Sequence, residues 1–138
     1  MASKPSQTDV KPSIVWLAAL FDLVLIVVFV LIGRRSHGEE FTVAGMLTTL
    51  WPFLAGLVVG WVVTRAWRHP LPILHPGMII WACTVVLGML LRVLSGQGVQ
   101  WSFILVAAIV TGIFLLGWRA VALLAVSVRR RSVPTSRQ

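Results

Sequence analysis

The sequence predicts an all-α integral membrane protein, folded as a four-helix up-and-down bundle. Of its 138 residues, 58% are hydrophobic and only 12% are charged, which is too little charge to cover a soluble domain of this length. The apolar residues also gather into four runs of about 20, the length that an α-helix needs to cross the hydrocarbon core of a bilayer. Lipid is therefore the expected solvent of most of the chain.

Each apolar run ends at a charged or proline-containing segment, which gives the boundaries of the predicted spans. The sequences that end or precede a run are GRR, TRAWR, HPG and RRR. We expect spans at about 14–32, 43–63, 77–94 and 101–126, within a transmembrane domain of about 14–128. Residues 1–13 are predicted to be a polar tail and residues 129–138 a basic tail. The first run is too long for a signal peptide and ends in two arginines, so we expect it to remain as a membrane helix.

The basic residues predict the orientation of the bundle. With four spans joined by short loops, neighbouring helices are antiparallel and both termini lie on one side. Nine of the twelve Lys and Arg residues then fall on the side of the termini or at helix ends near it, and the other three are Arg34, Arg35 and Arg92. The positive-inside rule therefore predicts cytoplasmic termini for a multi-pass protein of the plasma membrane.

Small residues predict which helix faces pack together. Close packing of helices in lipid favours small residues at a spacing of three or four, as in the GLVVG sequence of the second span. The glycines expected at helix contacts are Gly56, Gly60, Gly88 and Gly112. Asp22 and Arg92 lie on the small-residue stripes of their own spans, so we expect both in the interior of the bundle.

Asp22 is the residue that most needs an explanation, because it would lie roughly 12 to 14 Å inside a hydrocarbon core about 30 Å thick. An unpaired charge there costs about 2.5 to 3.5 kcal/mol. Helical side chains lean towards the N-terminus of their helix, so Arg92 and Arg119 lean towards the level of this carboxylate. Thr84 and Thr111 fall within about one turn of it.

These residues predict a buried polar cluster of Asp22, Arg92, Arg119, Thr84 and Thr111. Arg92 is the preferred partner of the carboxylate, because Arg119 follows a GW pair that is typical of the membrane interface. The alternative is that both arginines extend towards the interface and Asp22 is a protonated hydrogen-bonding group between helices.

We find no pattern of catalytic, metal-binding or cofactor-binding residues. HExxH, GxSxG, CxxC and paired acids are all missing from the sequence. His69 and His75 lie in one loop without a third ligand, and His37 lies on the opposite side, so no metal site is expected. The basic residues do not form a patch with stacking aromatic side chains, which argues against nucleic acid as a partner.

Two functions are compatible with this pattern. The first is an accessory or scaffold protein that binds a larger membrane complex, a second copy of itself or anionic lipid, the last through Arg129, Arg130 and Arg131. These three arginines could also serve only to set the topology. The alternative function is a small oligomeric transporter or channel for an anionic solute or protons. Intramembrane charges often mark such pathways, and Asp22 and Arg92 would form this one.

Four segments carry a family resemblance. Asp22 in the first span, GRRSH at its end, PFLAGLVVGW in the second span and LGMLLR in the third resemble a family of small actinobacterial membrane proteins. The family also occurs in halophilic archaea and is a domain of unknown function. The resemblance covers residues 16–128 and implies a four-helix plasma-membrane protein. The positions that it marks are Asp22, Gly60, Trp61 and Arg92, with Arg34 and His37 as candidates at the outer face.

Overall fold

The computed structural model of the protein describes residues 10–132. Four long helices account for most of this part of the chain, and it contains no strand. They are α1 (Pro12–Ser36), α2 (Val43–Thr64), α3 (Ile79–Leu94) and α4 (Trp101–Arg131), with an irregular turn η1 (Ile73–Met78) leading into α3. Each helix, with η1 counted as part of α3, is long and apolar enough to cross a membrane. The predicted all-α, four-span fold class is confirmed.

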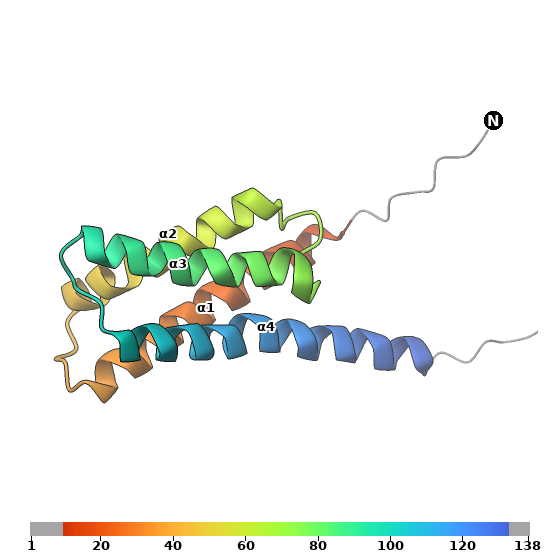
Figure 1. Cartoon of the computed structure of the whole chain (residues 1–138). Helices are drawn as coiled ribbons and strands as arrows, with labels where there is room; N and C mark the ends of the chain where they lie inside the picture. The colour runs from red at the N-terminus through yellow and green to blue at the C-terminus, as the bar shows by residue number, and fades with distance from the viewer. Residues whose placement is uncertain (1–9, 133–138) are drawn as a thin grey trace, which may run out of the picture.

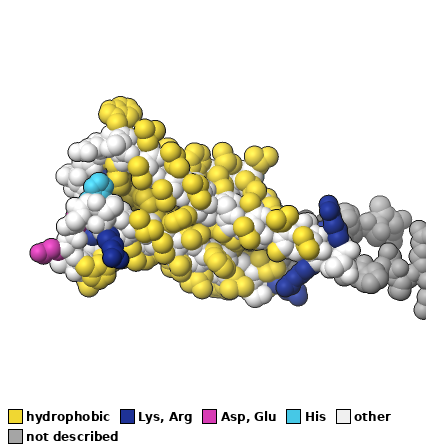
Figure 2. Space-filling model, turned by 90° about the horizontal axis from the view of Figure 1, so that it is seen from below, with side chains coloured by type: hydrophobic (Ala, Val, Ile, Leu, Met, Phe, Trp, Pro, Cys, Tyr) yellow, Lys and Arg dark blue, Asp and Glu magenta, His cyan; other side chains and the backbone are white. Residues whose placement is uncertain are grey.

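The helices alternate in direction, so the bundle has two distinct ends (Figure 1). The start of α1, the end of α4 and residues 65–72 lie at one end, which we call the termini end. Loops 37–42 and 95–100 lie at the other, which we call the far end. On the face shown in Figure 2, charged side chains lie at the two ends and hydrophobic side chains cover the length between them. This apolar belt is the surface expected of a multi-pass membrane protein.

Local sequence explains where the helices begin and end. Pro12 begins α1, where its missing N–H costs nothing, and the Thr42 hydroxyl caps α2 by accepting from the backbone N–H of Gly45. Arg65 ends α2 in the left-handed conformation, with a φ of 51°. At His75 the backbone is extended, which separates η1 from the regular helix after it.

Helices α2 and α3 make the closest contact in the bundle, and two glycines allow it. A Cβ atom on Gly56 would lie 2.6 Å from the carbonyl oxygen of Cys83, and one on Gly60 would lie 2.8 Å from the Cα atom of Ile80. Both distances are too short for any residue with a side chain. The two helix backbones can therefore touch only because these positions are glycine.

The other two glycines expected at helix contacts face aromatic rings. Gly88 of α3 lies under the Phe53 ring of α2, and Gly112 of α4 lies against the Trp81 indole of α3. The Trp81 N–H donates to the carbonyl oxygen of Ala108, 2.9 Å away. All four of these glycines thus lie where two helices meet.

Three of the observed helices, α1, α2 and α4, extend beyond their predicted spans, and α4 is the longest of them. Its 31 residues correspond to roughly 46 Å, well over the thickness of about 30 Å of a hydrocarbon core. Residues 129–131, which the sequence suggested would begin a tail, form the last turn of this helix. The rest of that tail from residue 133, and residues 1–9 of the N-terminal tail, lie outside the described residues.

Candidate functional site

The carboxylate of Asp22 is fully buried, and its hydrogen-bonding capacity is filled. Arg119 donates to it through both terminal nitrogens, from Nη1 to Oδ1 at 2.8 Å and from Nη2 to Oδ2 at 2.7 Å. The indole N–H of Trp61 donates to Oδ2 at 2.8 Å, and that of Trp118 donates to Oδ1 at 2.7 Å. Four donors thus surround one carboxylate. We call these four residues the Asp22 cluster.

The guanidinium of Arg119 is equally buried and has further partners of its own. Its Nε donates to the carbonyl oxygen of Pro70 at 2.9 Å, and its Nη1 also donates to the carbonyl oxygen of Leu115 at 2.8 Å. Its central carbon lies 4.7 Å from the centre of the Trp118 ring. The cluster therefore ties α1, α2 and α4 to the segment before α3, and it leaves no carboxylate oxygen free for a ligand.

The structure corrects the predicted partner of Asp22, which is Arg119 and not Arg92. Asp22 lies 14 residues before the end of α1, and Arg92 lies two residues before the end of α3, so they differ in depth by roughly 18 Å. Both helices end at the far end of the bundle. Arg119 lies 12 residues before the end of α4 and therefore reaches the level of the carboxylate from the termini end.

The two threonines are also not members of the cluster. Thr84 and Thr111 are fully buried, but each hydroxyl donates to a carbonyl oxygen one turn back in its own helix, that of Ile80 for the first and that of Ala107 for the second. A threonine hydroxyl in an apolar helix can form its hydrogen bond with a carbonyl oxygen of its own helix, so a buried threonine does not require a partner on another helix. Of the five residues predicted to meet, the structure brings together only Asp22 and Arg119.

Two residues of the cluster were not recognised as partners of the carboxylate. The family resemblance marks Trp61 without giving it a partner, and the GW pair predicts an interfacial position for Trp118. A buried indole N–H needs an acceptor, and Asp22 is the only acidic residue within the predicted spans. Buried indole donors and a buried carboxylate acceptor therefore indicate a Trp–Asp contact, although the sequence does not show which of the seven tryptophans face the acid.

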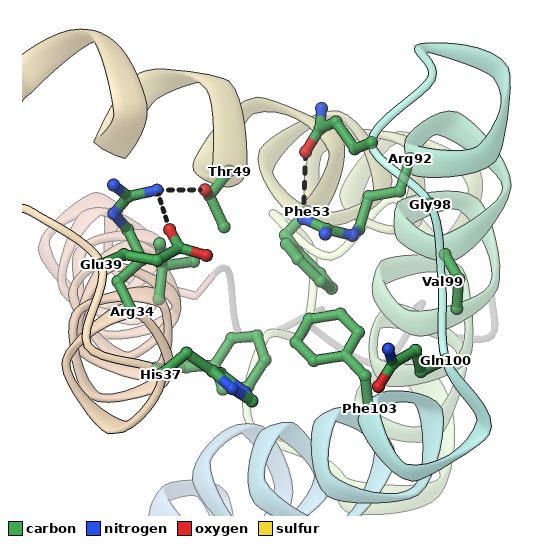
Figure 3. A pocket seen from close by; sticks show the side chains of 14 residues that line it. Arg34, His37, Glu39, Thr49, Phe53, Arg92, Gly98, Val99, Gln100 and Phe103 are labelled. Carbon is green, nitrogen blue, oxygen red and sulfur yellow. Dashed lines mark hydrogen bonds and ion pairs between the residues drawn. The ribbon is translucent and has the colours of Figure 1, made fainter.

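A second site lies at the far end, where all four helices surround a cavity of about 330 Å³. Figure 3 shows Arg34 of α1 and Arg92 of α3 on opposite sides of it, with the Phe53 and Phe103 rings between them. The polar residues of the lining are Arg34, His37, Glu39, Thr49, Arg92, Gln97 and Gln100. Its apolar residues include Phe29, Val30, Phe53, Val99 and Phe103. We call this space the far-end cavity.

Arg34 is held firmly at the edge of the far-end cavity. Its Nη1 donates to the carbonyl oxygen of Gly45 at 3.1 Å and to the hydroxyl of Thr49 at 3.0 Å, and its Nη2 donates to the carbonyl oxygen of Glu40 at 3.0 Å. Nη1 also lies 2.6 Å from a carboxylate oxygen of Glu39. These contacts fix the loop between α1 and α2 over the start of α2.

Arg92 is held more loosely on the other side. Its Nη1 donates to the side-chain oxygen of Gln97 at 3.0 Å, and its central carbon lies 4.8 Å from the centre of the Phe103 ring. Within residues 10–132, the Nε atoms of Arg92 and Arg34 are both buried and have no hydrogen-bond partner. Two cationic groups thus keep unused donors beside one cavity.

The histidines behave as isolated side chains in the described part of the chain. His37 lines the far-end cavity, while His69 and His75 are exposed near the termini end. Residues 10–132 contain no group of three His, Cys, Asp or Glu side chains that could hold a metal ion.

Comparison with known proteins identifies a family and no function. The sequence model of a family described as "Protein of unknown function (DUF3054)" matches residues 19–122. No curated protein and no solved structure matches the chain.

Proposed function

The chain belongs to the DUF3054 family of proteins of unknown function, and from the geometry of the far-end cavity we propose that it binds a small anionic solute there for transport across the bilayer. One observation carries the proposal. Arg34 and Arg92 come from different helices, flank a single cavity and each keep a buried N–H donor without a partner within residues 10–132. Unpaired buried donors are unfavourable, by about 1 to 3 kcal/mol each, and an anion that accepts from them removes that cost.

The charge of the cavity favours an anion over a cation. Arg34, Arg92 and Glu39 are its ionised side chains, so the lining carries a net positive charge when His37 is neutral. The apolar rings beside these groups lower the local dielectric, which strengthens the attraction for an anion.

The Asp22 cluster has a different part in this proposal. Its acceptors are filled by Arg119 and two indoles, so it does not bind solute and instead closes the bundle on the side of the termini end. Release towards that end then requires the contact of Arg119 with Pro70 to open. The proposed pathway uses Arg92, as the sequence predicts, but pairs it with Arg34 across the cavity in place of Asp22. The proposed role involves no catalysed reaction. Assembly into a small oligomer, which the sequence predicts for a transporter, is part of the same proposal.

The proposal can be tested by electrical recording from the purified protein in liposomes adsorbed to a solid support. Addition of a binding anion should produce a saturable charge displacement that liposomes without protein lack. Arg92→Gln should weaken the apparent affinity by about tenfold or more, since a hydrogen bond to a charged group contributes about 1.5 to 3 kcal/mol. Arg35→Gln is the matched control, because Arg35 is exposed and outside the lining. The same response from both variants and wild type would contradict the proposal.

A second function is favoured by the length of α4. Arg129, Arg130 and Arg131 are exposed on its last turn, beyond the part that a bilayer core covers. There they are suited to anionic headgroups, at about 1 kcal/mol for each basic residue near the surface. Native mass spectrometry with phosphatidylglycerol should show retained lipid that replacement of all three by Gln removes. Replacement of exposed Arg65 and Arg68 by Gln should leave most of it.

A further inference from the structure

We propose that the solute of the far-end cavity is an organic monocarboxylate with a compact apolar body, such as an aromatic acid. This inference rests on the proposed function and names the chemical class of its ligand. Three properties of the cavity lead to it, namely its charge, its free donors and its apolar rings.

The charge of the lining matches one negative charge on the ligand. Arg34 and Arg92 are the cations, and the Glu39 carboxylate lies 2.6 Å from Arg34 and already neutralises one of them. A monoanion completes the balance. A dianion such as a phosphate monoester would leave an uncompensated charge beside aromatic rings, which is unfavourable in a site of low dielectric.

The free donors match the two oxygen atoms of a carboxylate. Arg92 uses Nη1 for Gln97, while its Nε and Nη2, which form one edge of the planar guanidinium, make no hydrogen bond within residues 10–132. Two parallel N–H groups on such an edge suit a carboxylate that accepts with both oxygens. Arg34 has both terminal nitrogens engaged and contributes only its Nε. Arg92, held by one side-chain hydrogen bond, is therefore the arginine that can turn towards a ligand.

The apolar part of the lining calls for an apolar body on the ligand. Phe29, Phe53 and Phe103 form a connected set, with ring centres 5.2 Å apart for the first pair and 6.3 Å apart for the second. Figure 3 shows the Phe53 and Phe103 rings between the two arginines. Phe53 is fully buried and Phe103 is half-buried, so a ligand bound at Arg92 would lie against the Phe103 ring, with Phe53 packed behind it. The cavity volume of about 330 Å³ is at the lower end of the range of about 300 to 1,000 Å³ for ligand pockets, which favours a compact ligand.

Titration calorimetry on the protein in mild detergent tests this inference with four probes. Benzoate carries both charge and ring, acetate and inorganic phosphate carry only charge, and benzyl alcohol carries only the ring. Benzoate should bind saturably and at least about tenfold more tightly than each of the other three. Arg92→Gln should weaken benzoate binding by about tenfold or more, Arg92→Lys should weaken it less because the charge remains, and Arg35→Gln should not change it.

The outcomes separate this inference from the proposed function. If acetate or phosphate binds as tightly as benzoate and depends on Arg92, the ligand class is wrong while the anion site stands. If no anion binds to folded wild-type protein, both proposals are overturned. If benzoate binds equally to wild type and to folded Arg92→Gln and Arg92→Lys variants, it partitions into the micelle and the inference is overturned.

Discussion

At the scale of single residues, the balance of charges around Asp22 decides what the cluster can do. Removing a carboxylate and a guanidinium from water is costly, and the cost is offset only when the geometry is good and the remaining hydrogen-bonding groups are satisfied. Here the ion pair has two parallel hydrogen bonds, and Trp61 and Trp118 fill the other acceptor positions. The Asp22–Arg119 ion pair is therefore tolerated in the interior as long as both members are present, and removal of either one should destabilise the fold.

Asp22→Asn should destabilise the folded protein by about 3 to 5 kcal/mol, because it leaves the buried Arg119 guanidinium without a counter-charge. The amide also replaces an acceptor oxygen by a donor that faces N–H groups. Chemical unfolding in micelles, followed by circular dichroism, measures the change. Glu40→Gln, the same substitution at an exposed acid, should shift stability by no more than about 0.5 kcal/mol. Equal stability of the two variants would show that the ion pair contributes nothing.

A double-mutant cycle identifies the partner of Asp22. Asp22→Ala and Arg119→Met should each be strongly destabilising, and the double variant should be more stable than either single variant by about 2 kcal/mol or more, because no charge remains buried alone. Rescue should be incomplete, since two indole N–H groups lose their acceptor. Arg92→Ala should give Asp22→Ala no rescue. If Arg92→Ala rescues and Arg119→Met does not, the pairing in the structure is wrong.

How much of the candidate site was predictable depends on what each residue requires. The sequence showed that Asp22 must be shielded, because lipid tails offer no donor, and that an arginine was the natural partner. The preference for Arg92 over Arg119 was wrong, because the partner depends on how far each helix is shifted along its neighbours, which the sequence does not show. The far-end cavity was predictable only as Arg34 and His37 at the outer face, since loops 37–42 and 95–100 decide which side chains meet there.

At the scale of helices, the contact between α2 and α3 depends on glycine. Gly56→Ala should destabilise the protein by about 1 to 3 kcal/mol, because its Cβ would lie 2.6 Å from the Cys83 carbonyl oxygen and 2.9 Å from the Thr84 Cα, and neither backbone can move aside cheaply. Gly117→Ala in α4 is the control, since its Cβ would have no neighbour within 4 Å. Alanine favours a helix over glycine, so the control should be neutral or slightly stabilised. Similar unfolding midpoints would contradict this account of the packing.

Helix existence was easier to predict than helix length. Runs of apolar residues identify spans because the bilayer sets their minimum length, but nothing in that rule stops a helix from continuing into water. Residues 127–131 continue α4 because the sequence SVRRR contains no proline or glycine. The prolines between α2 and α3 had the opposite effect, and the regular helix begins only at Ile79, after the kink at His75.

At the scale of the whole molecule, the two ends differ in charge. Within residues 10–132 the termini end carries six basic residues and no acidic one, apart from the mutually neutralised Asp22 and Arg119. The basic residues are Lys11, Arg65, Arg68, Arg129, Arg130 and Arg131. At the far end Glu39 and Glu40 offset two of three arginines. Combined with the positive-inside rule, this difference predicts that the far-end cavity faces the outside of the cell.

Cysteine labelling in cells tests that consequence. Cys83 is the single native cysteine, so Cys83→Ala gives a background without thiols. Exposed positions are then replaced one at a time, with Glu40→Cys at the far end and Arg68→Cys at the termini end. A membrane-impermeant maleimide should label Glu40→Cys in intact cells and Arg68→Cys only after permeabilisation, because basic segments are retained in the cytoplasm. The reverse pattern would place the cavity inside the cell, where it would receive anions from the cytoplasm. Labelling of both variants in intact cells would mean that the chain inserts in two orientations, against the charge bias of its ends.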